Sequence, residues 1–355
     1  MDRKFWAGKR VFITGHTGFK GSWLAVWLQD MGAEVHGYAL EPSTDPALFS
    51  ATAAADDMAS SVYADILDDV ALTAAVKAAH PEVVFHLAAQ SLVRRSYAAP
   101  VETYAVNVMG TVHLLEALRT VSGLRAVANI TTDKCYENQE WVWGYRENDV
   151  LGGYDPYSSS KTCSEMVSAA YRRSFFDNGA GVGLATARAG NVIGGGDWAE
   201  DRLIPDMVRA WRMRREVRIR NPKAVRPWQH VLEALRGYLM LVERMFDDPR
   251  RFSAAWNFGP EYGDARPVEW MVSRFAESLG GGQWQADAQS GAPHEAGLLR
   301  LDCSKAHEML AWRPALRVKE GVDWTAAWYR AFDEGADMRR YTLNQIRTYE
   351  ARVKS

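Results

Sequence analysis

The chain has 355 residues, of which 47% are hydrophobic and 24% charged, with 28 Gly and 13 Pro. These values are those of an ordinary globular protein, and they exclude the disordered and fibrous classes. With 42 Lys and Arg against 44 Asp and Glu, the formal charge of -2 provides no overall field that draws the chain onto nucleic acid or an anionic membrane.

The three cysteines, Cys135, Cys163 and Cys303, form neither a C-x-x-C motif nor a His/Cys cluster at metal-ligand spacing. This usage is typical of a reducing compartment, and it predicts neither disulfides nor a zinc site. The first ten residues lead into a short apolar strand, and the sequence has no run of 18 apolar residues. We therefore expect a cytoplasmic protein without a membrane-spanning segment.

From Arg10 to Arg188, short β-branched runs alternate with longer amphipathic stretches, which is typical of a parallel sheet covered by helices on both faces. We predict strands at 10–15, 34–39, 61–65, 82–88, 125–131 and 181–188. We predict helices at 19–30, 69–79, 100–120 and 157–178. The predicted fold class is α/β, with a Rossmann-like, doubly wound parallel sheet.

After Gly194 the pattern changes to turn-rich segments between shorter helical pieces, such as 231–246 and 268–279. We interpret this part as a smaller C-terminal α/β lobe that supplies loops to a ligand site. The predicted domains are 1–188 for a dinucleotide and mainly 189–355 for a second ligand, with the chain free to cross between them. Eleven of the 14 Trp follow residue 140, and we expect most of them in the core.

Three glycines follow the first predicted strand at G-x-x-G-x-x-G spacing, and an amphipathic run follows them at once. Glycine there permits a tight turn, a close approach of backbone amides to a pyrophosphate, and close packing of the helix on the strand. Because strand, turn and helix are in the right order, we interpret the loop as a dinucleotide site. Its assigned residues are Gly15, His16, Thr17, Gly18, Phe19, Lys20 and Gly21.

Two further places bear on the cofactor. An acidic residue normally ends the second strand and binds the adenosine ribose, but this chain has Ala39 there, with Glu41 two residues beyond. The residues therefore leave NAD and NADP open. Asp65 and Ile66, after the third strand, place a carboxylate beside an apolar side chain, and we expect them to contact the adenine.

Tyr157 and Lys161 are four residues apart at the start of a predicted helix, so both project from one face. An ammonium near a phenol stabilises the phenolate and lowers the tyrosine pKa from about 10 towards neutrality, which makes the tyrosine a usable base. The same spacing is common on solvated helices, so the pair is informative only together with the other motifs.

Thr131, Thr132, Asp133 and Lys134 come directly after the fifth predicted strand. Open α/β sheets bind their ligands at the carboxyl ends of the strands. We therefore expect Thr132 to share a substrate hydroxyl with Tyr157, and Asp133 with Lys134 to form an acid–base pair that simple hydride transfer does not need. A solvated loop with an ion pair is the structural alternative.

Five segments, in the family's order, resemble the extended short-chain dehydrogenase/reductase family and extend over nearly the whole chain. They are GHTGFKG (15–21), HLAAQ (86–90), TTDK (131–134), YSSSK (157–161) and RAGNVIGGGDW (188–198). Within this family, residues 132–147 and 197–206 resemble the 4,6-dehydratases that act on CDP-glucose. The resemblance implies NAD as the cofactor, with Ala88 and Ala89 beside it.

By this resemblance, Thr132, Tyr157 and Lys161 match the family's catalytic group, and Asp133 with Lys134 fall on the dehydration pair. The expected reaction converts CDP-glucose to CDP-4-dehydro-6-deoxyglucose by oxidation at C4, loss of water across C5 and C6, and return of the hydride to C6. Related dTDP-glucose dehydratases carry Asp-Glu at the two positions. Since this chain has lysine at the second, the C5 base is Asp133, Lys134 or water.

For the sugar nucleotide, the resemblance points to Ser91, Asn191, Arg202 and Arg226. The arginines suit this role because a planar guanidinium makes bidentate contacts with a diphosphate. A nucleotide-sugar 4-epimerase, which does not need the dehydration pair, and a dinucleotide sensor without catalysis are alternatives. Dehydration of a dTDP- or GDP-sugar is another, since the residues do not identify the base.

Four remaining features carry smaller predictions. His16 and Lys20 replace the small and aliphatic residues usual in the wider family, so we expect loose cofactor binding. Six arginines in 209–220 have a single aromatic residue, Trp211, among them and the net charge is negative, so we interpret them as a solvated helix face and expect no nucleic acid partner. The eight histidines form no metal set, and His86 is expected to be packed. The helices at 100–120 and 157–178 are expected to pair with their copies in a homodimer or homotetramer.

Overall fold

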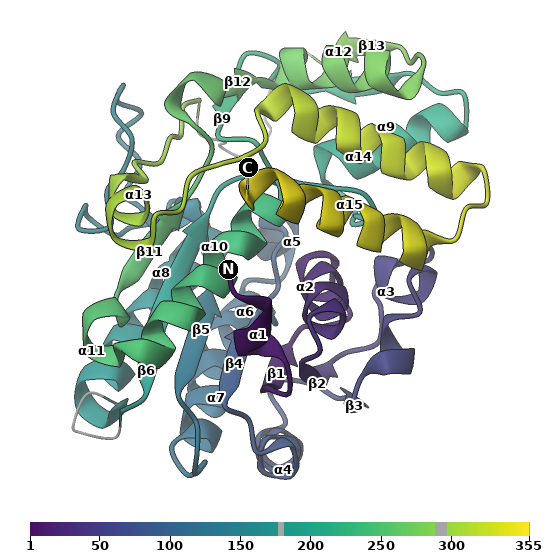
Figure 1. Ribbon diagram of the computed structural model, residues 1–355. Coiled ribbons are helices and arrows are strands. Elements are labelled where there is room, and N and C mark those ends of the chain that lie inside the picture. The colour runs from purple at the N-terminus through teal and green to yellow at the C-terminus, as the bar shows by residue number, and fades with distance from the viewer. Residues whose placement is uncertain (177–180, 288–296, 355) are drawn as a thin grey trace.

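The computed structural model describes residues 1–176, 181–287 and 297–354, and a seven-stranded parallel sheet lies at its centre (Figure 1). In spatial order the strands are β11 (Ala255–Phe258), β6 (Gly183–Ala189), β5 (Ala126–Ile130), β4 (Val83–His86), β1 (Arg10–Thr14), β2 (Glu34–Ala39) and β3 (Ser60–Tyr63). The strand order reverses between β1 and β4. Such a switch point is where open α/β sheets bind their ligands.

Side chains of the central strands alternate between two cores, one on each face of the sheet. Val11 and Ile13 of β1 belong to the core with α2 (Phe19–Asp30) and α10 (Val231–Asp247). Phe12 belongs to the other core, with α4 (Asp69–Ala79) and α7 (Gly110–Leu118). Burial of both faces explains why these strands are continuous apolar runs, and it confirms the predicted doubly wound fold class.

The predicted strands and helices of the first half are confirmed, with ends that differ by at most two residues where the structure describes them. The predicted helix at 100–120 consists of α6 (Pro100–Tyr104), the π-helical turn η2 (Ala105–Met109) and α7. The helix predicted at 157–178 is α8 (Pro156–Tyr171) followed by a second π-helical turn, η4 (Arg172–Phe176). Its predicted end lies outside the described residues.

Strand β11 was not among the predicted strands, although it completes the central sheet. It pairs with β6, with Ala255 opposite Thr186 and Phe258 opposite Ala189. Four residues are too few to show a periodicity, and they lie among turn-rich segments. The chain therefore returns from the C-terminal lobe to the central sheet, and only the tertiary pairing reveals this return.

Within its described residues, the C-terminal lobe contains three two-stranded sheets. They pair β7 (Val192–Ile193) with β10 (Gln229–His230), β8 (Val217–Ile219) with β13 (Trp284–Ala286), and β9 (Val225–Arg226) with β12 (Arg266–Pro267). At the top of Figure 1 lie α9 (Leu203–Arg212), α12 (Val268–Leu279) and α14 (Val318–Asp333). The last helix, α15 (Met338–Lys354), packs on α2, where the indole of Trp27 donates to Glu350 Oε1 at 2.8 Å.

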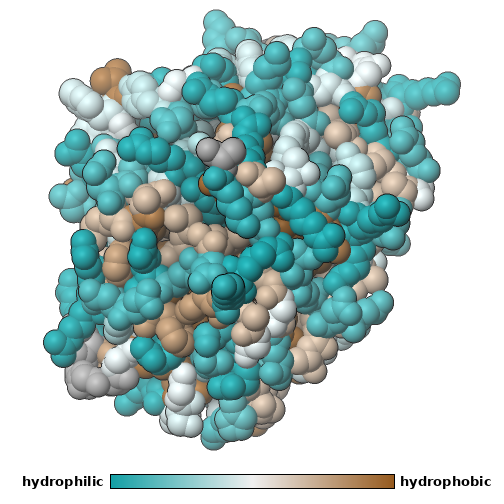
Figure 2. Space-filling view, viewed as in Figure 1, coloured by the Kyte–Doolittle hydropathy of each residue, from teal (hydrophilic) through white to brown (hydrophobic). Residues whose placement is uncertain are grey.

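Shorter elements connect these layers. They are α1 (Arg3–Trp6), α3 (Leu48–Ala51), η1 (Ala54–Asp57), α5 (Val93–Ala98), η3 (Asp133–Cys135), α11 (Pro249–Phe252), η5 (Tyr262–Asp264) and α13 (Ser304–Leu310). The face shown in Figure 2 is mostly hydrophilic, with hydrophobic residues scattered among polar ones. Among the described helices, none combines the length and apolarity that a bilayer crossing requires.

Candidate active site

The loop between β1 and α2 approaches its neighbours too closely for side chains. Gly15 has a φ of +76°, and a Cβ there would lie 2.7 Å from the backbone nitrogen of Ala88. A Cβ on Gly21 would collide with the carbonyl oxygen of Gly15, so α2 begins directly against the loop. Gly18 is the N-cap of α2, and no side chain caps this end. Uncapped amides at a helix N-terminus suit a pyrophosphate, so the loop fits the predicted dinucleotide.

The other residues predicted at the cofactor surround this loop. Thr17 donates its hydroxyl to the carbonyl oxygen of Leu40 at 2.8 Å. Asp65 is exposed and accepts the amide of Leu67 at 2.9 Å, whereas Ile66 is buried. Phe19, at the start of α2, and the partly buried Ala88 and Ala89, after β4, complete the set. Their roles remain predictions.

His16 and Lys20 lie in different surroundings. The His16 ring is buried, with Nε2 at 2.8 Å from Ser61 Oγ, and it fills the space above Gly37 of β2. Burial lowers the pKa of His16 to about 4, so the ring is neutral at pH 7. Burial and the neighbouring Arg202 lower the pKa of Lys20 to about 8, against the opposing effect of two carboxylates. Lys20 therefore belongs to the catalytic side of the loop, and His16 to the packing of β2 and β3.

Asp133 is buried directly after β5, with 2% of its surface exposed. Thr132 precedes it as the N-cap of η3 and donates its hydroxyl to Asp133 Oδ1 at 3.1 Å. Within the described ranges, Asp133 Oδ2 has no hydrogen-bond partner. Burial raises the pKa of Asp133, although Lys134, Thr132 and Arg226 act against it. The site thus favours the protonated carboxylic acid more than water does.

Tyr157 enters the same site from the first turn of α8. The side chain of Asp155 caps this helix by accepting the amide of Ser158 at 2.9 Å, which starts the helix just before Tyr157. Tyr157 is buried and hydrogen-bonded to Thr132, so the two side chains lie together in one site. Burial raises the pKa of Tyr157 to about 12, and the hydrogen bond with Thr132 lowers it only in part.

The prediction that Lys161 brings the pKa of Tyr157 towards neutrality is wrong for this structure. Lys161 donates Nζ–H to the carbonyl oxygen of Ile130 at 3.0 Å. Burial and the like charge of Lys20 lower the pKa of Lys161 to about 7. A lysine that is only partly charged at neutral pH stabilises a phenolate weakly. Arg202 is the cation that lowers the pKa of Tyr157 here.

Two of the predicted substrate residues, Arg202 and Arg226, reach this cluster from the C-terminal lobe. Arg202 donates to Ser91 Oγ at 2.8 Å and to Asp197 Oδ2 at 3.0 Å, so the structure brings Ser91 and Arg202 together. Arg226 is buried and close enough to Asp133 to lower its pKa. Asn191 precedes β7, and its carbonyl oxygen accepts the amide of Gln229 at 3.0 Å.

Motif reading missed two residues that hold the site together. Asp197, within GGGDW, orients Arg202 through an ion pair, and its own side chain is 6% exposed. Asn107, in the π-helical turn η2, donates to Ser160 Oγ at 2.8 Å and accepts the amide of Gln90 at 2.9 Å. Asp197 comes shortly before Arg202 in the sequence, and a carboxylate so close to an arginine predicted at the diphosphate could have indicated the ion pair. The π-helical turn has none, because it arises from packing.

His86 is packed, as predicted: it is buried, with Nδ1 at 2.7 Å from Thr14 Oγ1 and Nε2 at 3.2 Å from Thr111 Oγ1. Burial lowers the pKa of His86 to about 3, so it is neutral. Within the described part of the chain, no three His, Cys, Asp or Glu side chains gather as metal ligands.

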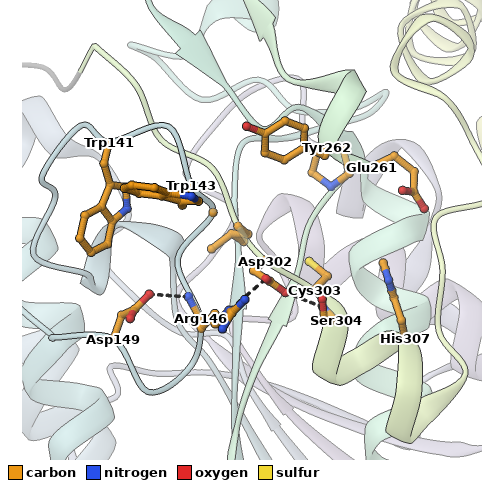
Figure 3. Close-up of a pocket in the computed structure, with 13 residues that line it drawn as sticks. Trp141, Trp143, Arg146, Asp149, Glu261, Tyr262, Asp302, Cys303, Ser304 and His307 are labelled. Atoms are coloured by element: carbon orange, nitrogen blue, oxygen red, sulfur yellow. Dashed lines mark hydrogen bonds and ion pairs between the residues drawn. The ribbon is translucent and has the colours of Figure 1, made fainter.

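A separate cavity of about 580 Å³ lies beside the loop after η3 and the start of α13 (Figure 3). Its lining residues are Trp141, Trp143, Gly144, Arg146, Asp149, Pro260, Glu261, Tyr262, Leu301, Asp302, Cys303, Ser304 and His307. Arg146 Nε bonds to Asp302 Oδ2 at 3.2 Å and ties the loop to α13. None of the residues predicted for the cofactor, the substrate or catalysis lines this cavity.

The doubly wound sheet, the glycine loop at its switch point, and the group Thr132, Tyr157 and Lys161 define the class of extended short-chain dehydrogenase/reductases. Residues 12–325 match the family model described as GDP-mannose 4,6 dehydratase. The chain therefore belongs to the extended short-chain dehydrogenase/reductase family.

Similar proteins agree with this assignment. A CDP-glucose 4,6-dehydratase of Salmonella typhimurium is 51% identical over 354 residues, which cover 98% of each chain. A GDP-mannose 4,6-dehydratase of Vibrio cholerae is 26% identical, over 88% of this chain and 91% of that protein. A UDP-glucose 4-epimerase structure from Stenotrophomonas maltophila superposes with a TM-score of 0.79 at 21% identity, over 92% of this chain and 99% of that one, and supports the fold.

Proposed function

We propose that the protein is a hydro-lyase that converts CDP-glucose to CDP-4-dehydro-6-deoxyglucose with NAD as a cofactor. The relative that is 51% identical over 98% of both chains carries this activity in its name. At the site, the observation that carries the proposal is the buried Asp133, whose raised pKa favours a carboxylic acid beside the Thr132–Tyr157 pair. Elimination of water needs such a proton donor, and a 4-epimerase does not.

The cofactor is held by the loop of residues 15–21, by Asp65 and Ile66 at the adenine, by Ala88 and Ala89, and by Lys161. The close backbone approach at Gly15 and Gly21 and the uncapped N-terminus of α2 support this placement. NAD supplies the hydride acceptor for oxidation at C4 and the hydride donor for C6. Residues 1–188 form the cofactor half, joined by β11, and residues 189–355 mainly form the sugar-nucleotide half.

The diphosphate of the substrate is held by Arg202 and Arg226, with Ser91 and Asn191 beside them. Ser91 and Asp197 already hold the guanidinium of Arg202 near Tyr157, which supports this role because a fixed planar fork suits bidentate contact. The sugar then lies between Tyr157 on α8 and Asp133 after β5.

In the first step, Tyr157 accepts the proton of the C4 hydroxyl while Thr132 orients that hydroxyl. Arg202 supports the phenolate, since it lowers the pKa of Tyr157. The new C4 ketone acidifies the hydrogen on C5. The electron pair of the C5–H bond then forms a C5–C6 double bond and expels the C6 hydroxyl, which Asp133 protonates so that it departs as water. The C5 proton passes to Lys134, to Asp133 once it has been deprotonated, or to water, and a proton returns to C5 at the end.

One experiment tests the type of reaction and the nucleobase of the substrate together. The enzyme is incubated in D2O with NAD and each of CDP-, dTDP-, UDP- and GDP-glucose, and products are identified by NMR and mass spectrometry. We expect a 4-keto-6-deoxy product with deuterium at C5 from CDP-glucose alone. A 4-epimerised sugar without loss of water would indicate an epimerase. Turnover of another sugar nucleotide would correct the nucleobase that we assign. No turnover would indicate a cofactor sensor.

We further propose that the enzyme works in the cytosol. Cys135, Cys163 and Cys303 are free thiols in the structure, and Cys135 and Cys303 are buried. Free thiols are typical of reducing compartments, where disulfides do not persist.

We predict that Tyr157→Phe lowers the rate of C4 oxidation by about a hundredfold or more, because the variant lacks the phenolic proton acceptor. Binding of the sugar nucleotide is expected to change little. Single-turnover absorbance of NADH measures the oxidation, and calorimetry with CDP-glucose measures binding. Near-normal NADH formation in this variant would refute the assignment.

We predict that Asp133→Asn uncouples the two halves of the reaction. Asparagine keeps the shape of the side chain but cannot donate an acidic proton to the C6 hydroxyl, so water loss slows by about a hundredfold or more. C4 oxidation remains measurable, and NADH accumulates in a single turnover. Loss of both steps to the same extent would contradict this role.

Lys134→Met tests whether the lysine is the C5 base, because methionine has a similar side-chain volume but cannot accept the proton. If Lys134 is the base, deuterium uptake at C5 falls in step with water loss. Unchanged uptake and normal NADH decay would remove Lys134 from the proton transfer, and would leave Asp133 or water as the base and the lysine as the partner of an ion pair.

We predict that NAD is bound loosely, so that the purified protein needs added NAD for full activity. The His16 ring fills space beside β2 and β3, Lys20 places a cation on the catalytic side of the loop, and Ala39 offers no carboxylate to the ribose. The NAD content of protein purified without supplement measures this directly. One NAD per chain would contradict the prediction.

We propose a homodimer or homotetramer built on the α6–α7 and α8 faces. Val101 of α6 is 82% exposed and Met166 of α8 is 62% exposed, so both helices offer apolar side chains that a second copy could cover. We predict that Met166→Glu dissociates the assembly. Val70→Glu, at a position on α4 that is 75% exposed, is the control and leaves the mass of the assembly unchanged. Analytical ultracentrifugation distinguishes the two, and a monomeric parent protein would refute the assembly.

A further inference from the structure

A buried ion pair joins Glu165, which lies one helical turn beyond Lys161 on α8, to Arg188 of β6. The side chains of Glu165 and Arg188 are each 3% exposed, and Arg188 bonds to both carboxylate oxygens at 2.9 Å. Thr131 and Thr186 donate their hydroxyls to the same carboxylate, at 2.5 and 2.7 Å. Burial opposes the charge of Glu165, but Arg188 and the two hydroxyls hold its pKa below the usual range.

Glu165 is connected to both parts of the proposed catalytic group. Its partner Thr131 directly precedes Thr132, so the hydrogen bond fixes the end of β5 from which the Thr132 hydroxyl points to Tyr157. On α8, the spacing of four residues places Glu165 on the same face as Lys161. One carboxylate therefore acts on the strand end and on the helix.

Arg188 is held from its opposite side by the segment that follows η3. Its NH1 donates to the hydroxyl of Tyr136 at 2.7 Å, and its guanidinium lies 4.8 Å from the centre of that ring. Tyr136 stacks on Tyr145 at 5.1 Å, and Tyr145 stacks on Trp141 at 5.3 Å. These aromatic rings extend from the buried pair to the cavity wall of Figure 3. The segment thereby limits the positions that Arg188 and Glu165 can take.

The charge of Lys161 depends on several neighbours. Burial and Lys20 of α2 oppose it, whereas Glu165 and the Cys135 sulfur of η3 favour it. His86 of β4 also faces Lys161 and is neutral. Since burial raises the pKa of Cys135 well above its ordinary value, its thiol carries no charge at neutral pH. Glu165 is therefore the ionised group that offsets Lys20.

We propose that Glu165 and Arg188 are positioning residues for the reaction: Glu165 favours the charged form of Lys161 and keeps Thr132 aligned with Tyr157, and Arg188, held by Tyr136, keeps Glu165 in place. Neither residue contacts the reacting atoms. The inference rests on the function proposed above, because it assigns the pair a role through Lys161 and Thr132.

The test compares the pH dependence of kcat in the parent enzyme and in Glu165→Gln, with saturating NAD and CDP-glucose. Without the negative charge, Lys161 loses its proton at a lower pH. The decline of kcat with rising pH therefore begins about one pH unit lower, the usual effect of one nearby charge. KM for CDP-glucose is expected to stay within about twofold, because Glu165 does not line the diphosphate site.

Glu233→Gln is the matched control. Glu233 of α10 is also a buried glutamate, 1% exposed, and accepts hydrogen bonds from Leu316 and Tyr349 at 2.6 Å each. Its loss is expected to lower the thermal midpoint without moving the pH profile. An equal shift in both variants would mean that any weakened core moves the profile, and would overturn the proposal.

Glu165→Gln leaves Arg188 as an unpaired buried charge and risks a folding defect. The double variant Glu165→Gln with Arg188→Met removes both charges, and the pH shift is expected to persist in it. The affinity for NAD, measured by calorimetry against pH, reports the charge of Lys161 without turnover. An unchanged pH profile in folded variants of an active enzyme overturns the inference alone. Absence of CDP-glucose turnover in the parent overturns the proposed function, and the NAD titration then decides the inference.

Discussion

Burial of charge at the carboxyl end of the central sheet is the constraint on which this site depends. Removing an ion from water costs several kcal/mol unless partners replace the lost hydration. Glu165 has four donors and stays ionised, whereas Asp133 has few partners and its carboxyl shifts towards the acid form. Lys161, beside Lys20, shifts towards the neutral amine. The extent of pairing therefore sets which buried group gives a proton and which keeps its charge.

Helix α8 meets this constraint by carrying two adjacent rows of residues on its buried side. Tyr157, Lys161 and Glu165 recur every four residues on the catalytic face. Ser160, Ser164 and Ser168 recur in the same way in an adjacent row and bond to the side chains of the neighbouring layers. Small hydroxyl side chains permit a close approach and satisfy buried polar groups. The row of serines thus fixes the rotation of α8, and with it the direction of Tyr157.

The two halves of the chain are joined more closely than a division into domains suggests. Strand β11 returns from the C-terminal lobe to the central sheet, and α15 returns to α2. Arg202 and Arg226 can therefore approach Asp133 and Tyr157 from a fixed direction. A site assembled from loops of one half and strand ends of the other gains precision from these returns, because neither half can shift without breaking buried pairs.

Local patterns in the sequence were enough to predict the doubly wound sheet and the glycine loop, because each depends on local periodicity or on a short spacing. The sequence also placed Tyr157 and Thr132 in one site, since strand ends and helix starts meet at the switch point. Only the tertiary structure decided the electrostatics. The predicted effect of Lys161 on the pKa of Tyr157 was wrong. Burial and Lys20 lower the charge of Lys161, and its ammonium donates to a backbone carbonyl instead. Burial and long-range pairing depend on residues far apart in the chain, and no local pattern records them.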